Sequence, residues 1–274
     1  MTQRDKVTGL SSKDRVDLLL VERGLAPSRA KAQALVLAGQ VFSGEQRIDK
    51  PGQTLPRNAL LRVQAGPRYV SRGGDKLEGA LVDCALSVEG SVCVDVGAST
   101  GGFTDCLLQH GAARVYAVDV GEGQLAQRLT RDARVVVMDR TNARHLAPES
   151  FPERIDLAVV DASFIGIELL APALARILPV GSRLLALVKP QFEAGRREAT
   201  RGRGVIRDPA LRAELIERAS HTLLTHGFEL LAGHDCRVRG PKGNLEHFLL
   251  AKRDARDQKN SPLTLDESAE ESAT

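Results

Sequence analysis

The sequence has few aromatic side chains: phenylalanine, tyrosine and tryptophan together make up 3% of its 274 residues, and tryptophan is absent. This scarcity argues against RNA-binding sheets that stack several bases on aromatic rings. Apolar runs are also short, and none approaches the ~18 residues of a membrane span. The start, MTQRDKVTGL, lacks the apolar segment of a secretion signal. We therefore expect a cytoplasmic protein with no membrane partner.

Cysteine is the other scarce residue with chemical consequences. The chain has no CxxC pair and no Cys/His spacing of a zinc site, and most of its cysteines have apolar neighbours: Cys84, Cys93, Cys106 and Cys236. We therefore expect no disulfide and no metal site. With 42% hydrophobic and 27% charged residues, the composition is that of a globular protein, and the length predicts one full domain with a smaller one.

The net charge of +3 is unevenly distributed. Residues 1–76 carry 14 Lys and Arg against 7 Asp and Glu, whereas residues 77–274 carry 24 against 28. A basic amino-terminal part attached to a near-neutral body is typical of a module that binds a polyanion, although a solvated charged face gives the same count.

Residues 15–63 predict a small α+β unit, preceded by a disordered lead-in over 1–14. A helix in RVDLLLVERG is followed by a second helix that Ser28 can cap, and short strand signals come next. Such a unit buries little area, so its function is expected on its surface. We predict RNA contacts from the basic side chains of this unit and from one in the following linker: Arg15, Arg29, Lys31, Arg47, Lys50 and Arg72.

This unit resembles the S4 RNA-binding domain, whose pattern runs R-x-D-x-x-L, G-L, S-R-x-x-A, G-x-V and K-P. The matching residues here are Arg15-Val-Asp17, Gly24-Leu25, Ser28-Arg29 with Ala32, Gly39-Gln-Val41, and Lys50-Pro51. The resemblance implies that RNA is the partner of the basic unit.

A glycine-containing linker over 64–74 precedes a second region, in which strand and helix signals alternate from residue 91. A helix over about 75–86 comes first, and the later strand signals are SVCVDVG, ARVYAVDV, ARVVVMD, IDLAVVD and SRLLALVK. Helical or polar segments separate them, among them a helix through EGQLAQRL (122–129), and a long polar loop is expected over 191–206. This order predicts an α/β domain over 75–252 with a mostly parallel sheet between helices. The last strand signals, FELLAGHDC and NLEHFLLAK, predict an antiparallel hairpin, and the polar tail 253–274 is predicted to be disordered.

A loop of small residues follows the first strand of this domain, where doubly wound sheets bind nucleotides. We expect its members to let a ligand approach the backbone: Gly97, Ser99, Gly101, Gly102 and Phe103. A dinucleotide fingerprint would need glycine in place of Ser99. The spacing from Gly97 to Gly101 also fits the G-x-S-x-G of a hydrolase, but that elbow normally follows several earlier strands of the same sheet.

S-adenosylmethionine is the ligand that the acidic strand ends favour. Asp119 lies 22 residues after Gly97 at the end of the second strand, where a carboxylate can bind both ribose hydroxyls. Asp139 ends the third strand and is placed near the adenine. The dinucleotide, hydrolase and purely structural interpretations remain open.

Two residues of opposite charge end the next strands. Asp161 follows the fourth strand and Lys189 the fifth, so both are expected at the carboxyl edge of the sheet, where ligands bind. Lys189 follows the apolar run LLALV and precedes Pro190, which argues against a freely solvated side chain.

The chain from Arg15 to about Lys252 resembles the TlyA-type RNA 2′-O-methyltransferases, some of which are labelled haemolysins. Their catalytic domain is similar to the FtsJ-like ribose methyltransferases. The motifs that carry the resemblance are Ser71–Leu77 (SRGGDKL), the loop Gly97–Phe103, Asp161–Phe164 (DASF), Lys189–Glu193 (KPQFE), Gly204–Asp208 (GVIRD) and Gly240–Phe248 (GPKGNLEHF).

The resemblance implies a class I Rossmann-like methyltransferase domain, S-adenosylmethionine as methyl donor and cytidine ribose in ribosomal RNA as substrate. It also implies a catalytic tetrad of Lys76, Asp161, Lys189 and Glu246. A ribose hydroxyl is a weak acid, so Lys189 would take its proton as a neutral base or stabilise the alkoxide as a cation, and the sequence leaves both roles open. No metal is required, because the leaving group is a neutral thioether.

Two alternatives stay open. Base methylation usually needs a cysteine nucleophile or an Asn/Asp-Pro-Pro-aromatic motif, and DASF lacks the prolines. The other alternative is an RNA-binding or membrane-active protein with an inactive methyltransferase domain. Ribosomal RNA or ribosomal subunits are the expected partners, and no stable protein partner is predicted.

Overall fold

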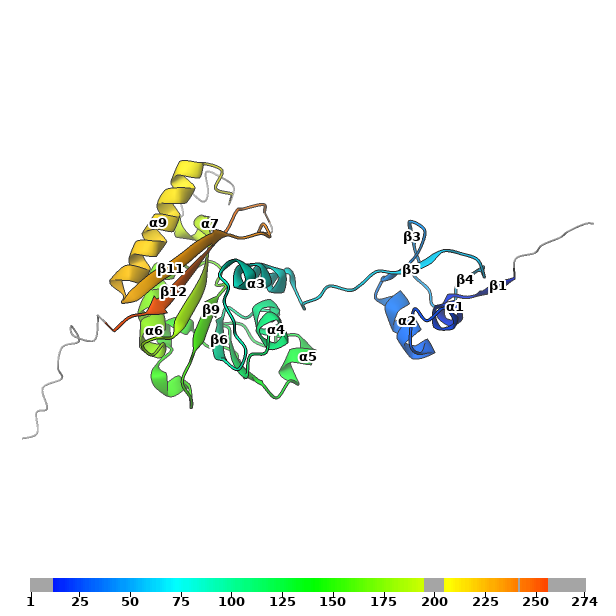
Figure 1. Ribbon diagram of the computed structural model, residues 1–274, viewed down its shortest axis with the longest axis horizontal. Coiled ribbons are helices and arrows are strands. Elements are labelled where there is room, and N and C mark those ends of the chain that lie inside the picture. Colours follow the sequence, from blue (N-terminus) through cyan, green and yellow to red (C-terminus); the bar gives the residue numbers. More distant parts are fainter. Residues whose placement is uncertain (1–11, 195–204, 241, 256–274) are drawn as a thin grey trace, which may run out of the picture. The chain divides into compact units, whose positions relative to one another are not determined.

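The computed structural model describes residues 12–194, 205–240 and 242–255 and divides into two compact units, Met1–Arg68 and Tyr69–Thr274 (Figure 1). The predicted lead-in and tail fall largely outside the described residues. Of their described residues, Lys13 and Asp14 belong to a strand and Arg253 ends another. Regular structure therefore begins before residue 15 and extends to Arg253.

The first unit is the small α+β unit that the sequence predicts. Its elements are β1 (Lys13–Arg15), α1 (Val16–Glu22), α2 (Arg29–Leu37), β2 (Val41–Ser43), β3 (Gln46–Arg47), β4 (Thr54–Pro56) and β5 (Leu61–Val63). β1 pairs with β4, and β2 lies between β3 and β5, all antiparallel. The side chain of Ser28 accepts a hydrogen bond from the backbone N–H of Lys31 and caps α2, as predicted.

The second unit is built on one sheet of seven strands in the order β11-β12-β10-β9-β6-β7-β8. The strands are β6 (Val92–Val96), β7 (Arg114–Val118), β8 (Val135–Met138), β9 (Leu157–Val160), β10 (Arg183–Val188), β11 (Phe228–Asp235) and β12 (His247–Arg253). The five strands from β6 to β10 are parallel, and β12 is antiparallel to both of its neighbours. The predicted parallel sheet with a carboxyl-terminal antiparallel hairpin is confirmed.

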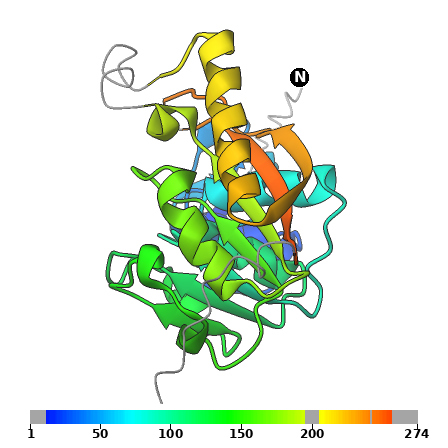
Figure 2. The same ribbon diagram turned by 90° about the vertical axis from the view of Figure 1, so that its left-hand side faces the viewer.

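Helices cover both faces of this sheet (Figures 1 and 2). They are α3 (Arg72–Asp83), α4 (Gly102–Gln109), α5 (Gln127–Thr130), α6 (Ile167–Ile177), α7 (Pro190–Glu193) and α9 (Pro209–Thr225), with single turns η1 (Ala143–His145) and η2 (Pro148–Ser150). Successive strand residues point to opposite faces, so Cys93 packs with α3 and α4, whereas Val94 packs with α6 and α9. This alternation produces two apolar layers, one on each face of the sheet.

The linker region differs from its prediction. α3 begins at Arg72, so Gly73 and Gly74, expected in a linker, form its first turn. A Cβ on Gly74 would lie 2.1 Å from the Tyr69 ring, and Tyr69 itself is buried. This glycine therefore marks close packing, which the sequence alone does not distinguish from a flexible joint.

Two later segments also differ from the sequence pattern. The helix expected through residues 122–129 is reduced to α5. The polar loop expected over 191–206 begins with α7, and its residues 195–204 lie outside the described part of the chain. Among the described residues, no helix is both long and apolar enough to cross a membrane.

Candidate functional site

Three predicted catalytic residues lie at the carboxyl edge of the parallel strands. Asp161 follows β9 and Lys189 follows β10. Glu246 directly precedes β12, which runs in the opposite direction, with Val188 opposite His247. The start of β12 therefore lies beside the end of β10, which brings Glu246 to the same edge.

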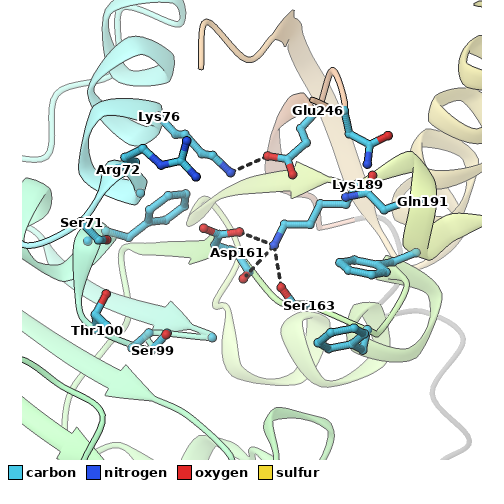
Figure 3. A pocket seen from close by; sticks show the side chains of 18 of the residues that line it. Ser71, Arg72, Lys76, Ser99, Thr100, Asp161, Ser163, Lys189, Gln191 and Glu246 are labelled. Carbon is cyan, nitrogen blue, oxygen red and sulfur yellow. Dashed lines mark hydrogen bonds and ion pairs between the residues drawn. The ribbon is translucent and has the colours of Figure 1, made fainter. Parts of the chain in front are cut away.

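The four predicted catalytic side chains form two ion pairs (Figure 3). Lys189 Nζ lies 2.6 Å from Asp161 Oδ1, in an orientation too poor for a hydrogen bond, and donates to Ser163 Oγ at 3.0 Å and Asp161 O at 3.3 Å. Lys76 Nζ, from α3, lies 2.5 Å from Glu246 Oε2. Both lysines and Glu246 are buried. Each cation is thus neutralised at a place with little solvent.

A pocket of about 840 Å³ opens over these pairs. Its lining includes all four paired side chains, the loop residues 97–100, Gly102, and Arg72 from α3. This volume is within the range of about 300–1,000 Å³ that is typical of small-molecule sites. The pocket therefore joins the glycine loop to the predicted catalytic residues.

Packing within the protein also requires glycine at two positions of the loop. Gly97 has φ +86°, and a Cβ there would lie 3.0 Å from the carbonyl oxygen of Asp161. A Cβ on Gly102 would lie 2.3 Å from Ser71 Oγ and 2.9 Å from the backbone nitrogen of Gly74. The space beside these glycines is filled by the protein itself. Close packing therefore accounts for the absence of their side chains, and both glycines also border the pocket.

Of the other three loop candidates, Ser99 borders the pocket, and Gly101 and Phe103 also serve the packing of the domain. Gly101 is the N-cap of α4 with φ +94°, and a Cβ there would lie 2.3 Å from Leu129 Cδ1. Phe103 is 3% exposed and stacks on Phe248, with 6.2 Å between ring centroids. One edge of Phe103 still borders the pocket.

The two predicted acidic residues hold loops in place. Asp119 follows β7 and accepts hydrogen bonds from the backbone N–H groups of Ser99 at 2.8 Å and Gly121 at 2.7 Å. Asp139 follows β8 and accepts from the Gly123 N–H at 2.8 Å. Both side chains are half-buried, and neither borders the pocket over the ion pairs. Their cofactor role therefore remains a prediction.

Asp95 is a buried carboxyl that the sequence interpretation did not single out. It lies in β6 with no exposed surface, and its Oδ2 accepts from both the N–H and the hydroxyl of Thr104. Its Oδ1 has no hydrogen-bond partner among the described residues. Burial raises the pKa of Asp95 to about 7, and the nearby Asp161 and Asp119 add to the shift. The alternation of residues along β6 would have placed Asp95 inside the domain. It would not have indicated that the pKa of Asp95 is raised.

Two phenylalanines at the pocket were also missed. Phe164 is 90% exposed with φ +66°, and its ring centroid lies 5.0 Å from that of Phe192. Lys189 Nζ lies 5.8 Å from the centre of the Phe192 ring. Exposed aromatic rings offer a surface on which a nucleobase can stack. Phe164 lies in the DASF motif and Phe192 in the KPQFE motif, so the motifs were the available signal. The low aromatic content of the chain argued against base stacking, and neither ring was predicted as part of the site.

Three of the predicted RNA-binding arginines are paired with carboxylates. Arg15 and Arg29 both bind Asp17, at 2.9 and 3.0 Å. Asp17 has no exposed surface, and these arginines together with Gln33 hold its pKa well below the usual range. Arg47 forms an exposed pair with Asp49 at 2.7 Å.

The other predicted RNA contacts lie in different places. Lys31 is exposed in the first turn of α2, and Lys50 is exposed just before Pro51. Arg72 belongs to α3 and borders the pocket of the second unit. The sequence placed Arg72 in the linker, whereas the structure places it at the start of α3, and its RNA-binding role remains a prediction.

Comparisons with known proteins agree with both units. Residues 69–253 match the family model of FtsJ-like methyltransferases, and residues 14–61 match that of the S4 domain. A Bacillus subtilis protein provisionally named an rRNA methyltransferase is 47% identical over 87% of this chain and 85% of its own. The 16S/23S rRNA (cytidine-2′-O)-methyltransferase TlyA of Mycobacterium tuberculosis is 43% identical over 88% of this chain and 90% of its own.

A solved structure shows the same similarity. A Streptococcus thermophilus protein with a provisional hemolysin name has a TM-score of 0.68 and 41% identity, covering 89% of this chain and 90% of that one. The resemblance drawn from the motifs is confirmed. The chain belongs to the FtsJ-like methyltransferase family and carries an S4 domain at its amino-terminal end.

Proposed function

We propose that this protein transfers a methyl group from S-adenosylmethionine to the 2′-hydroxyl of a cytidine in ribosomal RNA. The observation that carries the proposal is the pair of buried lysine–carboxylate contacts beside the glycine loop. Relatives named rRNA (cytidine-2′-O)-methyltransferases support the choice of substrate.

The residues around the loop fit the methyl donor. Residues 97–100 border the pocket with small side chains only. Each carboxylate oxygen of Asp119 accepts one hydrogen bond from a backbone N–H group, so both oxygens can still accept a hydrogen bond from a ribose hydroxyl. We assign Asp119 to the ribose and Asp139 to the adenine. When bound, S-adenosylmethionine supplies an electrophilic methyl group on a sulfonium.

Lys189 is the residue that we place at the ribose hydroxyl. Its Nζ donates hydrogen bonds to Asp161 O and Ser163 Oγ and forms an ion pair with Asp161 Oδ1, which fixes its position beside the pocket. A charged Lys189 stabilises the developing alkoxide, and a deprotonated one takes the hydroxyl proton. Lys76 and Glu246 complete the site as a second ion pair beside that of Lys189 and Asp161.

The S4 domain supplies RNA binding in this proposal. Its exposed cations suit phosphate groups, and Phe164 offers an exposed ring next to Lys189 for the target base. Ribosomal RNA or a ribosomal subunit is then the partner, which places the enzyme in the cytoplasm.

The position of the transferred methyl group tests the proposal. Ribosomal subunits from a strain without the gene are incubated with the protein and isotope-labelled donor, and methylated nucleosides are mapped by mass spectrometry. We expect the label on the ribose of one or more cytidines. A matched RNA with 2′-deoxycytidine at the mapped position should remain unmethylated. Label on a base, or methylation of the deoxy RNA, would contradict ribose methylation.

A further inference from the structure

A fully buried carboxylate of the S4 domain binds two of the arginines that were predicted to contact RNA. Asp17, in the first turn of α1, has no exposed surface. It accepts hydrogen bonds from Arg15 Nε at 3.0 Å, Arg15 Nη2 at 2.9 Å, Arg29 Nε at 3.0 Å and Gln33 Nε2 at 2.9 Å. Both of its oxygens are therefore used within the protein, and no part of its charge is open to solvent.

Arg15 and Arg29, unlike Asp17, are partly exposed to solvent. Their side chains are 42% and 53% exposed, although each is fixed through Nε. Arg15 Nη1 and both Nη groups of Arg29 have no hydrogen-bond partner among the described residues. A guanidinium carries five N–H donors in a rigid fork, so each arginine retains donors that point away from Asp17.

Neighbouring backbone fixes the position of Arg15 further. The N–H groups of Val16 and Asp17 donate to the carbonyls of Gln53 and Pro51, which brings the loop after Lys50 against the start of α1. A Cβ on Gly52 would lie 3.1 Å from Arg15 Nη1. The guanidinium therefore lies directly against the bare backbone of this loop.

We propose that Asp17 is a positioning residue for RNA: it holds Arg15 and Arg29 as a fixed pair that receives backbone phosphates. This inference rests on the proposed RNA-binding function of the S4 domain. It has a consequence opposite to simple charge counting. The negative charge of Asp17 lowers the net charge of a surface that binds a polyanion, so charge alone predicts tighter RNA binding when it is removed. We expect weaker binding, because Arg15 and Arg29 lose the carboxylate that holds both guanidinium groups in place.

The main test removes the charge of Asp17 and keeps its shape. Asp17→Asn in the full chain is compared with the parent by fluorescence anisotropy on labelled 16S and 23S rRNA transcripts at one salt concentration. Glu45→Gln is the matched control, because Glu45 is exposed and forms no ion pair among the described residues. We expect about tenfold weaker binding for Asp17→Asn, on the order of one charge-assisted hydrogen bond, and unchanged or slightly tighter binding for Glu45→Gln. Equal or tighter binding by Asp17→Asn would overturn the proposal.

Charge-conserving variants keep the test valid if Asp17→Asn unfolds the small domain. Arg15→Lys and Arg29→Lys retain every positive charge but lose the fork that binds Asp17 and a phosphate together. We expect each to bind several-fold more weakly with a nearly unchanged dependence on salt, since the number of cations is the same. Full affinity in both variants would show that charge alone matters and would overturn the proposal.

The double variant Arg15→Ala/Arg29→Ala separates this inference from the function on which it rests. Weaker RNA binding by the double variant with normal binding by Asp17→Asn would overturn only the positioning role. Unchanged RNA binding by the double variant would overturn the positioning role and the RNA-binding role of this surface together. Neither result affects the assignment of methyl transfer, which is measured separately on ribosomal subunits.

Discussion

Lys76 and Glu246, 170 positions apart in the sequence, form an ion pair with 2.5 Å between Nζ and Oε2. Lys76 comes from α3, the first helix of the catalytic unit, and Glu246 from the start of β12, its last strand. Lys76 is 8% exposed and Glu246 is 1% exposed, so little of either residue is open to solvent. The site therefore forms only when α3 and β12, which come from the two ends of this unit, are both packed in place.

Breaking this pair should destabilise the catalytic unit. Glu246→Gln and Lys76→Met each leave a buried charge without its partner, a change that typically costs about 3–5 kcal/mol. The double variant Lys76→Met/Glu246→Leu leaves no charge and should be more stable than either single variant. Tyrosine fluorescence during urea unfolding reports on this unit alone, because both tyrosines, Tyr69 and Tyr116, belong to it and tryptophan is absent. Single variants as stable as the parent would contradict the prediction.

Lys189 should matter for the chemical step and little for binding. Lys189→Ala is expected to lower the single-turnover rate of methyl transfer by about 10²–10⁴ while donor affinity stays close to normal. Lys189→Arg should be nearly as slow, because a planar guanidinium does not fit the position of an ammonium held between Asp161 and Ser163. Calorimetry of donor binding and quenched-flow kinetics on ribosomal subunits measure the two effects separately. Near-normal turnover by Lys189→Ala would remove Lys189 from the reaction.

The sequence predicted correctly that Asp161 and Lys189 lie at the ends of neighbouring strands. Asp161 and Lys189 were expected together because the carboxyl ends of parallel strands meet at one edge, and the register of β9 and β10 places them there. The pairing of Lys76 with Glu246 was different. Nothing local links residues so far apart, so the resemblance to a known family was the only signal for it.

The sequence could not show what fills the space around a residue. Gly102 was expected to let a ligand approach the backbone, and it borders the pocket, but its missing side chain also leaves room for Ser71 and Gly74. Arg15 and Arg29 were expected as RNA contacts, but the anchoring role of Asp17 depends on burial and on tertiary hydrogen bonds. Burial of a polar group and contacts between distant segments are properties of the folded chain, which residue spacing does not encode.

The close approach of α3 and α4 predicts that alanine is destabilising at Gly102 and tolerated at Gly73. Gly102→Ala places a Cβ 2.3 Å from Ser71 Oγ and 3.0 Å from Gly73 Cα, so α3 must shift, at about 1–3 kcal/mol. Gly73→Ala meets no atom closer than 3.4 Å and should be tolerated. Urea unfolding followed by tyrosine fluorescence compares the two. Equal stability of the two variants would show that the helices are not in tight contact.

Asp95 should give the protein a pH-dependent stability that a single substitution removes. Burial raises the pKa of Asp95 to about 7 from the ordinary 3.8, so the folded state binds a proton that the unfolded state releases above about pH 4. The stabilising contribution is therefore full below pH 4 and is lost as the pH rises toward 7, with a slope of at most about 1.4 kcal/mol per pH unit.

Asp95→Asn cannot ionise, so its free energy of unfolding should vary less between pH 4.5 and 7.5 than that of the parent. Asp132→Asn is the control: Arg134 lowers the pKa of Asp132, so its contribution is constant across this range and its removal should not change the slope. Urea unfolding at a series of pH values, read by tyrosine fluorescence, gives the three curves. If the curves of Asp95→Asn and the parent run parallel, Asp95 is ionised in the folded protein throughout, and its unpartnered Oδ1 must be stabilised by a group that the described contacts do not contain.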